Sequence, residues 1–461
     1  MPVLAAYMVP HPPMIVPQVG RGSEKRIPET VRAYREVASR IAGLKPDTVI
    51  ISSPHSVLYA DYFHISPGKK ASGDFGGFGA PKAAFSETYD RELVQCICRA
   101  ADEQGFPAGT LGERDRSLDH GIMVPLYFIE QEYTDFRLVR LSLSGLSLAR
   151  HYEFGLLVRR AVEETGRRVV FVASGDLSHK LQSYGPYGFA PEGPEYDRRI
   201  MDVCSRGAFG ELFSFSESFC DRAAECGHRS FVIMAGVLDG LCVRAEELSH
   251  EDVTGVGYGI CSFVPGEPSP DRHFLDRLRK EQAEALAARR AAEDSYVRLA
   301  RETIENYVTT GKRTGVPGWV PPEMKERAAG VFVSIHEDGR LRGCIGTIQP
   351  VCGCVAEEIT HNAVSAAVRD PRFSPIRPDE LDKLEINVDV LTEPERISSR
   401  DELDVKRYGV IVSSGAKRGL LLPDLDGVDT VDEQVSIAMK KGGISPRDRI
   451  TLERFEVIRH V

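Results

Sequence analysis

Two short stretches, AAYMVPHPPMIV at residues 5–16 and DTVIISSPHSVLY at residues 47–59, decide the predicted fold of this chain. Each is an apolar run that ends within a few residues in a proline and a histidine, His11 in the first and His55 in the second. Uninterrupted apolar runs are typical of strands that are buried on both faces of a sheet. We therefore predict two central strands, each of which presents an imidazole at its carboxyl end.

Two further histidines occupy similar positions. His179 follows the apolar run of RVVFVASGDLSHK, and His120 precedes that of SLDHGIMVPLYF. Loops that leave the carboxyl ends of strands in an open α/β sheet converge on one crevice. Each histidine by itself is compatible with a structural, hydrogen-bonded residue. Four of them in such positions favour a metal site with two imidazole ligands and one or two imidazoles for proton transfer.

The first part of the chain alternates strand-like runs with longer amphipathic segments, which predicts an α/β layer fold. The predicted strands are 3–9, 47–53, 136–144 and 168–174, and the predicted helices are 27–44, 89–105 and 229–241.

A change in composition marks the end of this first domain. FVPGEPSPDRHF at 263–274 gathers proline, glycine and charge, which predicts a domain boundary. The segment 272–307 is rich in Ala, Glu, Arg and Leu and predicts one long helix or two closely spaced ones. The predicted organisation is a first domain at 1–266, a helical linker at 267–289 and a smaller α+β domain at 290–461.

Composition narrows the class of protein. The chain has 461 residues with 42% apolar and 27% charged residues and a net charge of −10, which argues against nucleic-acid binding. It contains no apolar stretch long enough to span a membrane and no recognisable signal peptide, so we expect a cytoplasmic protein without a membrane partner.

The ten cysteines of the chain show no paired CxxC spacing and are expected to be reduced thiols. We also expect a homo-oligomer.

Six motifs of the first domain, taken in order, resemble those of the class III extradiol ring-cleavage dioxygenases (the LigB superfamily) and their Memo-like relatives. These motifs are HPP at 11–13, SPHS at 53–56, LDHGIMVPL at 118–126, GDLSHKL at 175–181, GPEYDRRIMD at 193–202 and AECGHRSFVIMAG at 224–236. The resemblance implies an α/β domain with a central mixed sheet.

The resemblance also implies roles for single residues. His11 and His55 are then the imidazole ligands of an iron(II) ion, with zinc or manganese as alternatives. His179 is the acid–base histidine that takes a proton from a bound catechol or aminophenol, and His120 orients substrate or oxygen. The third ligand is Glu225, as in the ring-cleaving enzymes, or its neighbour Cys226, as in the Memo-like proteins. We expect Glu225, because a carboxylate completes the facial triad of iron(II) oxygenases.

The second domain contains one dense motif, GRLRGCIGTIQP at 339–350. Cys344 lies beside Arg342 between Gly343 and Gly346, so the motif indicates either a pocket with a reactive thiol or a tight turn that requires glycines. This domain resembles the AMMECR-type domain, which implies a fold and a pocket around these residues rather than a reaction. The matching segments are LRGCIGT at 341–347, NAVSAAVRDPRFSPI at 362–376, LEINVDVLTEPE at 384–395 and GLLLP at 419–423.

Two functions are compatible with these features. The first is a non-haem Fe(II)-dependent extradiol dioxygenase that acts on a small catechol or aminophenol-like aromatic. The second is suggested by the pairing of the domains, which resembles the bacterial AmmeMemoRadiSam system with its radical-SAM partner. In that case the chain is a metal-binding component of a modification system without ring cleavage of its own. The chain contains no CxxxCxxC motif, so radical chemistry belongs to a partner.

Overall fold

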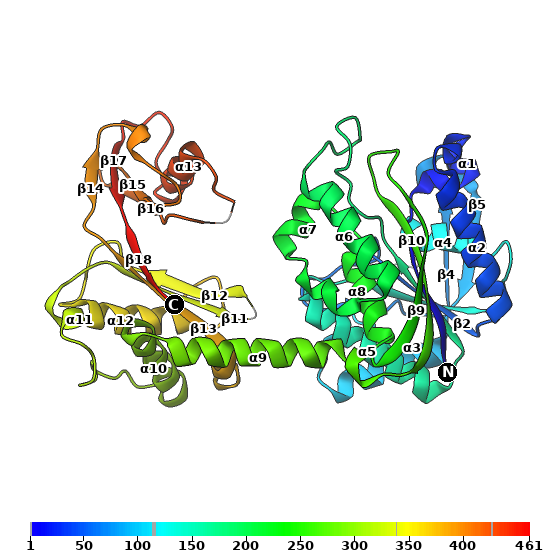
Figure 1. Ribbon diagram of the computed structural model, residues 1–461, viewed down its shortest axis with the longest axis horizontal. Helices are drawn as coiled ribbons and strands as arrows, with labels where there is room; N and C mark the ends of the chain where they lie inside the picture. Colours follow the sequence, from blue (N-terminus) through cyan, green and yellow to red (C-terminus); the bar gives the residue numbers. More distant parts are fainter. Residues whose placement is uncertain (1, 113–116, 338, 426) are drawn as a thin grey trace. The chain divides into compact units, whose positions relative to one another are not determined.

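The computed structural model describes residues 2–112, 117–337, 339–425 and 427–461 (Figure 1). The chain divides into two compact units, Met1–Lys280 and Glu281–Val461. The division falls inside helix α9 (Phe274–Ala292), which covers much of the predicted linker.

The first unit is built on a six-stranded sheet with the order β7-β2-β8-β1-β10-β9. The four strands β7, β2, β8 and β1 are parallel, whereas β10 pairs antiparallel with β1 and β9 pairs antiparallel with β10, so the predicted mixed sheet is confirmed. The strands are β1 (Val3–Val9), β2 (Thr48–Ser53), β7 (Arg137–Ser142), β8 (Val169–Ser174), β9 (Leu241–Glu251) and β10 (Tyr258–Pro268).

Helices cover both faces of this sheet, as Figure 1 shows for α2 and α4 on one side and α5 and α8 on the other. Alternate residues of β1 enter different cores: Ala6 and Met8 pack with the α5 and α8 side, and Ala5 and Tyr7 with the α2 and α4 side. This two-sided burial explains why the strands are apolar without alternation. The helices are α1 (Pro17–Gly20), α2 (Pro28–Leu44), α3 (Arg91–Glu103), α4 (His120–Ile129), α5 (Leu148–Thr165), α6 (Glu192–Arg206), α7 (Glu217–Ala223) and α8 (His228–Val237).

One part of the predicted boundary is wrong. The first half of FVPGEPSPDRHF belongs to β10, where Pro265 pairs with Val243 and Pro268 with Leu241. Strand β1 pairs with β10 only as far as Phe263. The prolines therefore lie where β10 has a neighbour on one side only, and there a missing N–H is tolerated.

The second unit contains two four-stranded sheets, with the orders β12-β11-β13-β18 and β14-β17-β15-β16. The predicted α+β domain is confirmed, and the segment 272–307 forms two helices rather than one. The strands are β11 (Val331–Glu337), β12 (Arg340–Gly346), β13 (Leu384–Leu391), β14 (Glu395–Ile397), β15 (Gly409–Ser414), β16 (Lys417–Leu421), β17 (Thr451–Phe455) and β18 (Val457–His460). The helices after α9 are α10 (Ser295–Thr310), α11 (Glu323–Glu326), α12 (Val355–Val368) and α13 (Val431–Lys441).

Two shorter pieces of the first unit matter for the site. Strands β4 (Lys70–Phe75) and β5 (Ala80–Thr88) form an antiparallel hairpin that is closed by the 3₁₀ turn η3 (Gly76–Phe78).

Among the described residues, no helix combines the length and the apolar character that a membrane crossing requires.

Candidate metal centre

Strands β2, β8 and β1 are parallel neighbours in the sheet, and their carboxyl ends lie at the same edge. Three of the histidines that were predicted to form the site follow these strands at that edge. His11 comes two residues after β1, His55 two residues after β2, and His179 five residues after β8. Parallel strands in register deliver the segments at their carboxyl ends to one edge. The predicted convergence is therefore a direct consequence of the sheet order.

His11, His55 and Cys226 form the centre of the site, and we call them the His–His–Cys group. Their potential ligand atoms all lie within 4.8 Å of one another. The Nε2 atoms of the two histidines are 3.0 Å apart, and Cys226 Sγ is 3.6 Å from His11 Nε2. Metal–nitrogen bonds of about 2.1 Å and metal–sulfur bonds of about 2.3 Å place donor atoms that share one ion at roughly these separations. The residues therefore fit a single transition-metal ion.

The hydrogen bonds of His11 determine which ring nitrogen faces this group. Its Nδ1 is 2.9 Å from Ser174 Oγ, and that hydroxyl donates to the carbonyl of Gly121 at 2.6 Å. A hydroxyl has only one proton to donate, so Ser174 accepts from His11 Nδ1–H. The lone pair of His11 is therefore on Nε2, where a metal would bind. Burial, reinforced by the neighbouring imidazoles, holds the pKa of His11 well below its usual value, which keeps the ring neutral as a ligand must be.

Glu225, the expected third ligand, does not join the two imidazoles. Its carboxylate accepts the backbone N–H of His228 at 2.6 Å, at the first turn of α8. Burial raises the pKa of this carboxyl to about 7. The alternative residue, Cys226, occupies the place that was expected for Glu225.

Two glycines bring Cys226 to the site. A Cβ on Gly175 would lie 2.1 Å from Gly227 Cα, so the segment after β8 and the segment before α8 cross at backbone contact. This crossing places the amide of Asp176 3.3 Å from Cys226 Sγ, to which it donates. Asp176 also accepts the backbone N–H of His11 at 2.7 Å. Asp176 was not among the predicted site residues, although its position directly after β8 was a signal for it.

His179 is held in one tautomer by the main chain. Its Nδ1 is 2.6 Å from the carbonyl oxygen of Ala224, which can only accept, so in the neutral ring the proton is on Nδ1 and the lone pair is on Nε2, which lies 4.0 Å from Asp176 Oδ2. Ala224 has a left-handed backbone with φ of 53°, an uncommon conformation for a residue with a Cβ. Burial lowers the pKa of His179. The free nitrogen of a neutral imidazole is the form that can accept a proton.

His120 completes the cluster of imidazoles. Its ring centroid is 4.0 Å from that of His55 and 5.3 Å from that of His11. The preceding residue, Asp119, accepts Ser53 Oγ at 2.6 Å and Ser56 Oγ at 2.7 Å, and it also caps α4 by accepting the N–H of Ile122. A single carboxylate thus ties the loop that carries His55 to the helix that begins with His120. Asp119 was not among the predicted site residues; an Asp directly before a helix is a cap signal that could have drawn attention to it, but nothing in the sequence indicates this second role.

The motif predicted for the second unit shows close backbone packing. A Cβ on Gly343 would lie 2.3 Å from the carbonyl oxygen of Ala366, and one on Gly346 would lie 2.2 Å from the ring of Phe332. Arg342 is bound to Glu380 at 2.9 Å, and Ser334 Oγ donates to Cys344 Sγ at 3.3 Å. These contacts explain both glycines by close packing inside strand β12, and the expected tight turn is not observed, because residues 340–346 form that strand.

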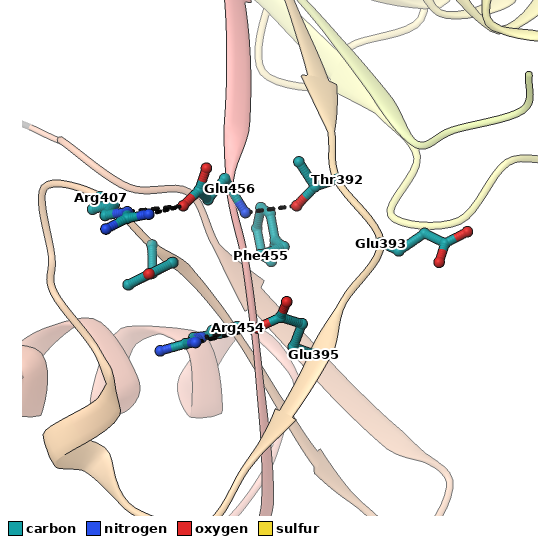
Figure 2. A pocket seen from close by; sticks show the side chains of 8 residues that line it. Thr392, Glu393, Glu395, Arg407, Arg454, Phe455 and Glu456 are labelled. Atoms are coloured by element: carbon teal, nitrogen blue, oxygen red, sulfur yellow. Dashed lines mark hydrogen bonds and ion pairs between the residues drawn. The ribbon is translucent and has the colours of Figure 1, made fainter.

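A cavity of about 470 Å³ lies elsewhere in the second unit (Figure 2). Two ion pairs line it, Arg407 with Glu456 at 2.8 Å and Arg454 with Glu395 at 3.2 Å. Both guanidinium groups also lie over the ring of Tyr408, at 4.9 and 4.4 Å from its centroid. Each arginine is already paired with a carboxylate, so the cavity does not resemble an anion site.

Among solved structures, an uncharacterised protein from Pyrococcus horikoshii, PH0010, is 35% identical with a TM-score of 0.34 and covers 36% of this chain and 88% of its own. A protein of Thermotoga maritima is 50% identical over 171 residues, which cover 36% of this chain and 98% of that protein.

Two family models and one curated relative show to which family the chain belongs. The family described as "Catalytic LigB subunit of aromatic ring-opening dioxygenase" matches residues 5–261, and the AMMECR1 family matches residues 297–460. Protein CA_C1420 of Clostridium acetobutylicum is 42% identical over 463 residues, which cover 98% of both chains. The chain therefore belongs to the LigB family, in a two-domain form in which an AMMECR1 domain follows the LigB domain.

Proposed function

We propose that the LigB domain is a non-haem Fe(II)-dependent ring-cleavage dioxygenase of the extradiol type, acting on a small catechol or aminophenol-like aromatic. The observation that carries this proposal is the pair of converging imidazoles, His11 and His55, with a further neutral histidine, His179, beside them. Membership of the LigB family supports the same chemistry.

The residues of the site would have different roles: metal binding, proton transfer and positioning. His11, His55 and Cys226 would hold the ion, which when bound supplies Lewis acidity and oxygen activation. His179 accepts a proton from a substrate hydroxyl at its free Nε2, because its Nδ1 is already committed to Ala224. His120, packed against His55, orients the substrate. Asp119 keeps the His55 and His120 segments together.

One observation favours a second candidate function. A thiolate in place of a carboxylate makes the donor set softer, which shifts metal preference toward zinc or another soft ion and away from the iron(II) facial triad. The second proposal is therefore a metal-binding component of an AmmeMemoRadiSam-type modification system, with a radical-SAM partner and no ring cleavage of its own. A cytoplasmic location, a homo-oligomer and the absence of nucleic-acid and membrane partners belong to both proposals.

Oxygen uptake separates the two functions. Protein purified without oxygen and loaded with iron(II) is offered a panel of catechols and aminophenols while dissolved oxygen is followed. Uptake that depends on both metal and substrate is expected for the dioxygenase. An iron-replete sample that consumes no oxygen with any member of the panel removes the first function and leaves the second. His11→Ala and His55→Ala are each expected to abolish this uptake, because each removes a proposed metal ligand. His361→Ala, in helix α12 of the other unit, is the matched control.

A further inference from the structure

Two aromatic side chains beside the candidate metal centre are exposed to solvent. Phe78 is 44% exposed and Tyr187 is 60% exposed. Single exposed aromatic residues are common on protein surfaces and need no explanation. These two differ because each packs its ring against a histidine of the site.

Phe78 contacts His120 from the hairpin turn. The two ring centroids are 5.5 Å apart at an interplanar angle of 68°. The turn is anchored at both ends: Gly76 donates its N–H to Asp74 Oδ1 at 2.6 Å, and Arg21 donates to the carbonyl of Gly79 at 3.2 Å. The exposed position of Phe78 is therefore set by a braced turn.

Tyr187 contacts His179 from a different segment, the connection between the histidine loop and α6. Its ring centroid is 5.0 Å from that of His179, and the two planes are nearly perpendicular at 89°. This connection is also braced, because Ala190 donates its N–H to the carbonyl of Lys180 and Gly188 donates to Gly185. Two unrelated segments thus each place a ring on a histidine and leave much of that ring accessible.

We propose that Phe78 and Tyr187 are specificity-determining residues that select a flat ring at the metal centre. Aromatic rings prefer offset or edge-to-face contacts with other rings, and such contacts add to the energy of simple apolar burial. The exposed apolar area of these two side chains is removed from water when a planar ring of the ligand lies against it, and this burial favours binding. A ligand with the same oxygen donors but no ring gains neither contribution. The inference rests on the proposed function for its metal centre, but it concerns selection of the ligand and not ring cleavage.

Ligand binding tests this inference without turnover. Anaerobic, iron(II)-loaded protein is titrated with a nitrocatechol, followed by its absorption change, and with oxalate, a ringless chelator, followed by calorimetry. Phe78→Ala and Tyr187→Ala are each expected to weaken nitrocatechol binding by about 3- to 10-fold, the size of one aromatic contact. Oxalate binding is expected to stay the same. Tyr187→Phe retains the ring and is expected to restore wild-type affinity.

Tyr184→Ala is the matched control. Tyr184 lies in the same connection and is 69% exposed, and among the described residues its ring contacts no histidine. Equal losses for nitrocatechol and oxalate, losses in Tyr184→Ala as large as in Tyr187→Ala, or no nitrocatechol binding by the wild type would each overturn the proposal. Selective nitrocatechol binding by a protein that consumes no oxygen would leave this inference standing and remove ring cleavage.

Discussion

Individual atoms decide the chemistry of the centre. Glu225 and Cys226 are neighbours in sequence, yet the carboxylate accepts from the α8 backbone while the thiol lies 3.6 Å from His11 Nε2. The two tautomers are likewise set by single acceptors, Ser174 for His11 and Ala224 for His179. The lone pair of each of these two rings is therefore on Nε2.

Metal content distinguishes the two candidate third ligands. Cys226→Ser is expected to weaken metal binding by more than about 100-fold, because changes outside the ligands alone cost about 10- to 100-fold. Glu225→Gln is expected to retain stoichiometric metal, since its amide oxygen can still accept from His228. Metal analysis after dialysis provides the measurement, with Cys98→Ser as a control thiol. Loss of metal in Glu225→Gln together with retention in Cys226→Ser would restore the carboxylate as the ligand.

The acid–base role of His179 predicts a separation of binding from turnover. His179→Ala is expected to keep the metal and to lose turnover by about 100-fold or more, the usual contribution of a positioned base. Metal analysis checks that the metal is retained, and oxygen uptake by the same preparation checks that turnover is lost. A variant that remains fully active would end this role.

At the scale of elements, the site depends on connections between segments rather than on any one helix or strand. Asp119 joins the segment after β2 to the start of α4, and the crossing of Gly175 with Gly227 joins the segment after β8 to the start of α8. Both connections are made by residues that hold ligands in place without being ligands themselves.

Removal of the Asp119 connection should affect metal binding more than it affects folding. Asp119→Ala is expected to lower the free energy of unfolding by about 1 kcal/mol, because the cap of α4 is lost. It is also expected to weaken metal binding by about 10- to 100-fold. Ser147→Ala removes the corresponding cap of α5 and serves as the control. Denaturation and metal titration of both variants give the comparison. Equal metal affinity in the two variants would show that Asp119 is only a cap.

The backbone crossing predicts a steric effect of a single methyl group. Gly175→Ala is expected to destabilise the first unit by about 1–3 kcal/mol and to displace Cys226, because the added Cβ would overlap Gly227. Gly43→Ala, inside α2 with open space around it, is expected to stabilise by about 0.5–1 kcal/mol. Urea denaturation checks both. A neutral Gly175→Ala would mean that the crossing can open at little cost.

Much of this element-level arrangement was predictable, and part of it was not. Strand β1 agrees with its predicted bounds, and α2 begins one residue later than predicted, because apolar runs and amphipathic periodicity are local properties. The extension of β10 through Pro265 and Pro268 was missed, since tolerance of proline depends on whether the strand has a second neighbour.

At the scale of the whole molecule, each unit has its own apolar cores. The two large clusters of the first unit and the three clusters of the second share no residues, and the metal centre belongs to the first unit alone. Separate cores allow separate unfolding.

Metal removal should therefore act on one unfolding transition only. Chelation is expected to lower the midpoint of the LigB-domain transition by about 5 °C or more, because a ligand present at about 100 times its Kd contributes about 2.7 kcal/mol. The AMMECR1-domain transition is expected to stay in place. Scanning calorimetry with and without chelator tests this, and a shift of both transitions would show that the units unfold together.

The sequence by itself determined the α/β class, the two domains and the meeting of His11, His55 and His179, because parallel strands carry the loops at their carboxyl ends to one edge. His120 joins them through the contacts of Asp119 with the segment after β2. Only the tertiary structure decided between Glu225 and Cys226. Their directions depend on the left-handed backbone at Ala224 and on the contact of Gly227 with Gly175, a residue 52 positions away along the chain. In an irregular turn, the backbone dihedral angles and the packing contacts determine the direction of each side chain. The spacing of residues along the sequence does not predict that direction.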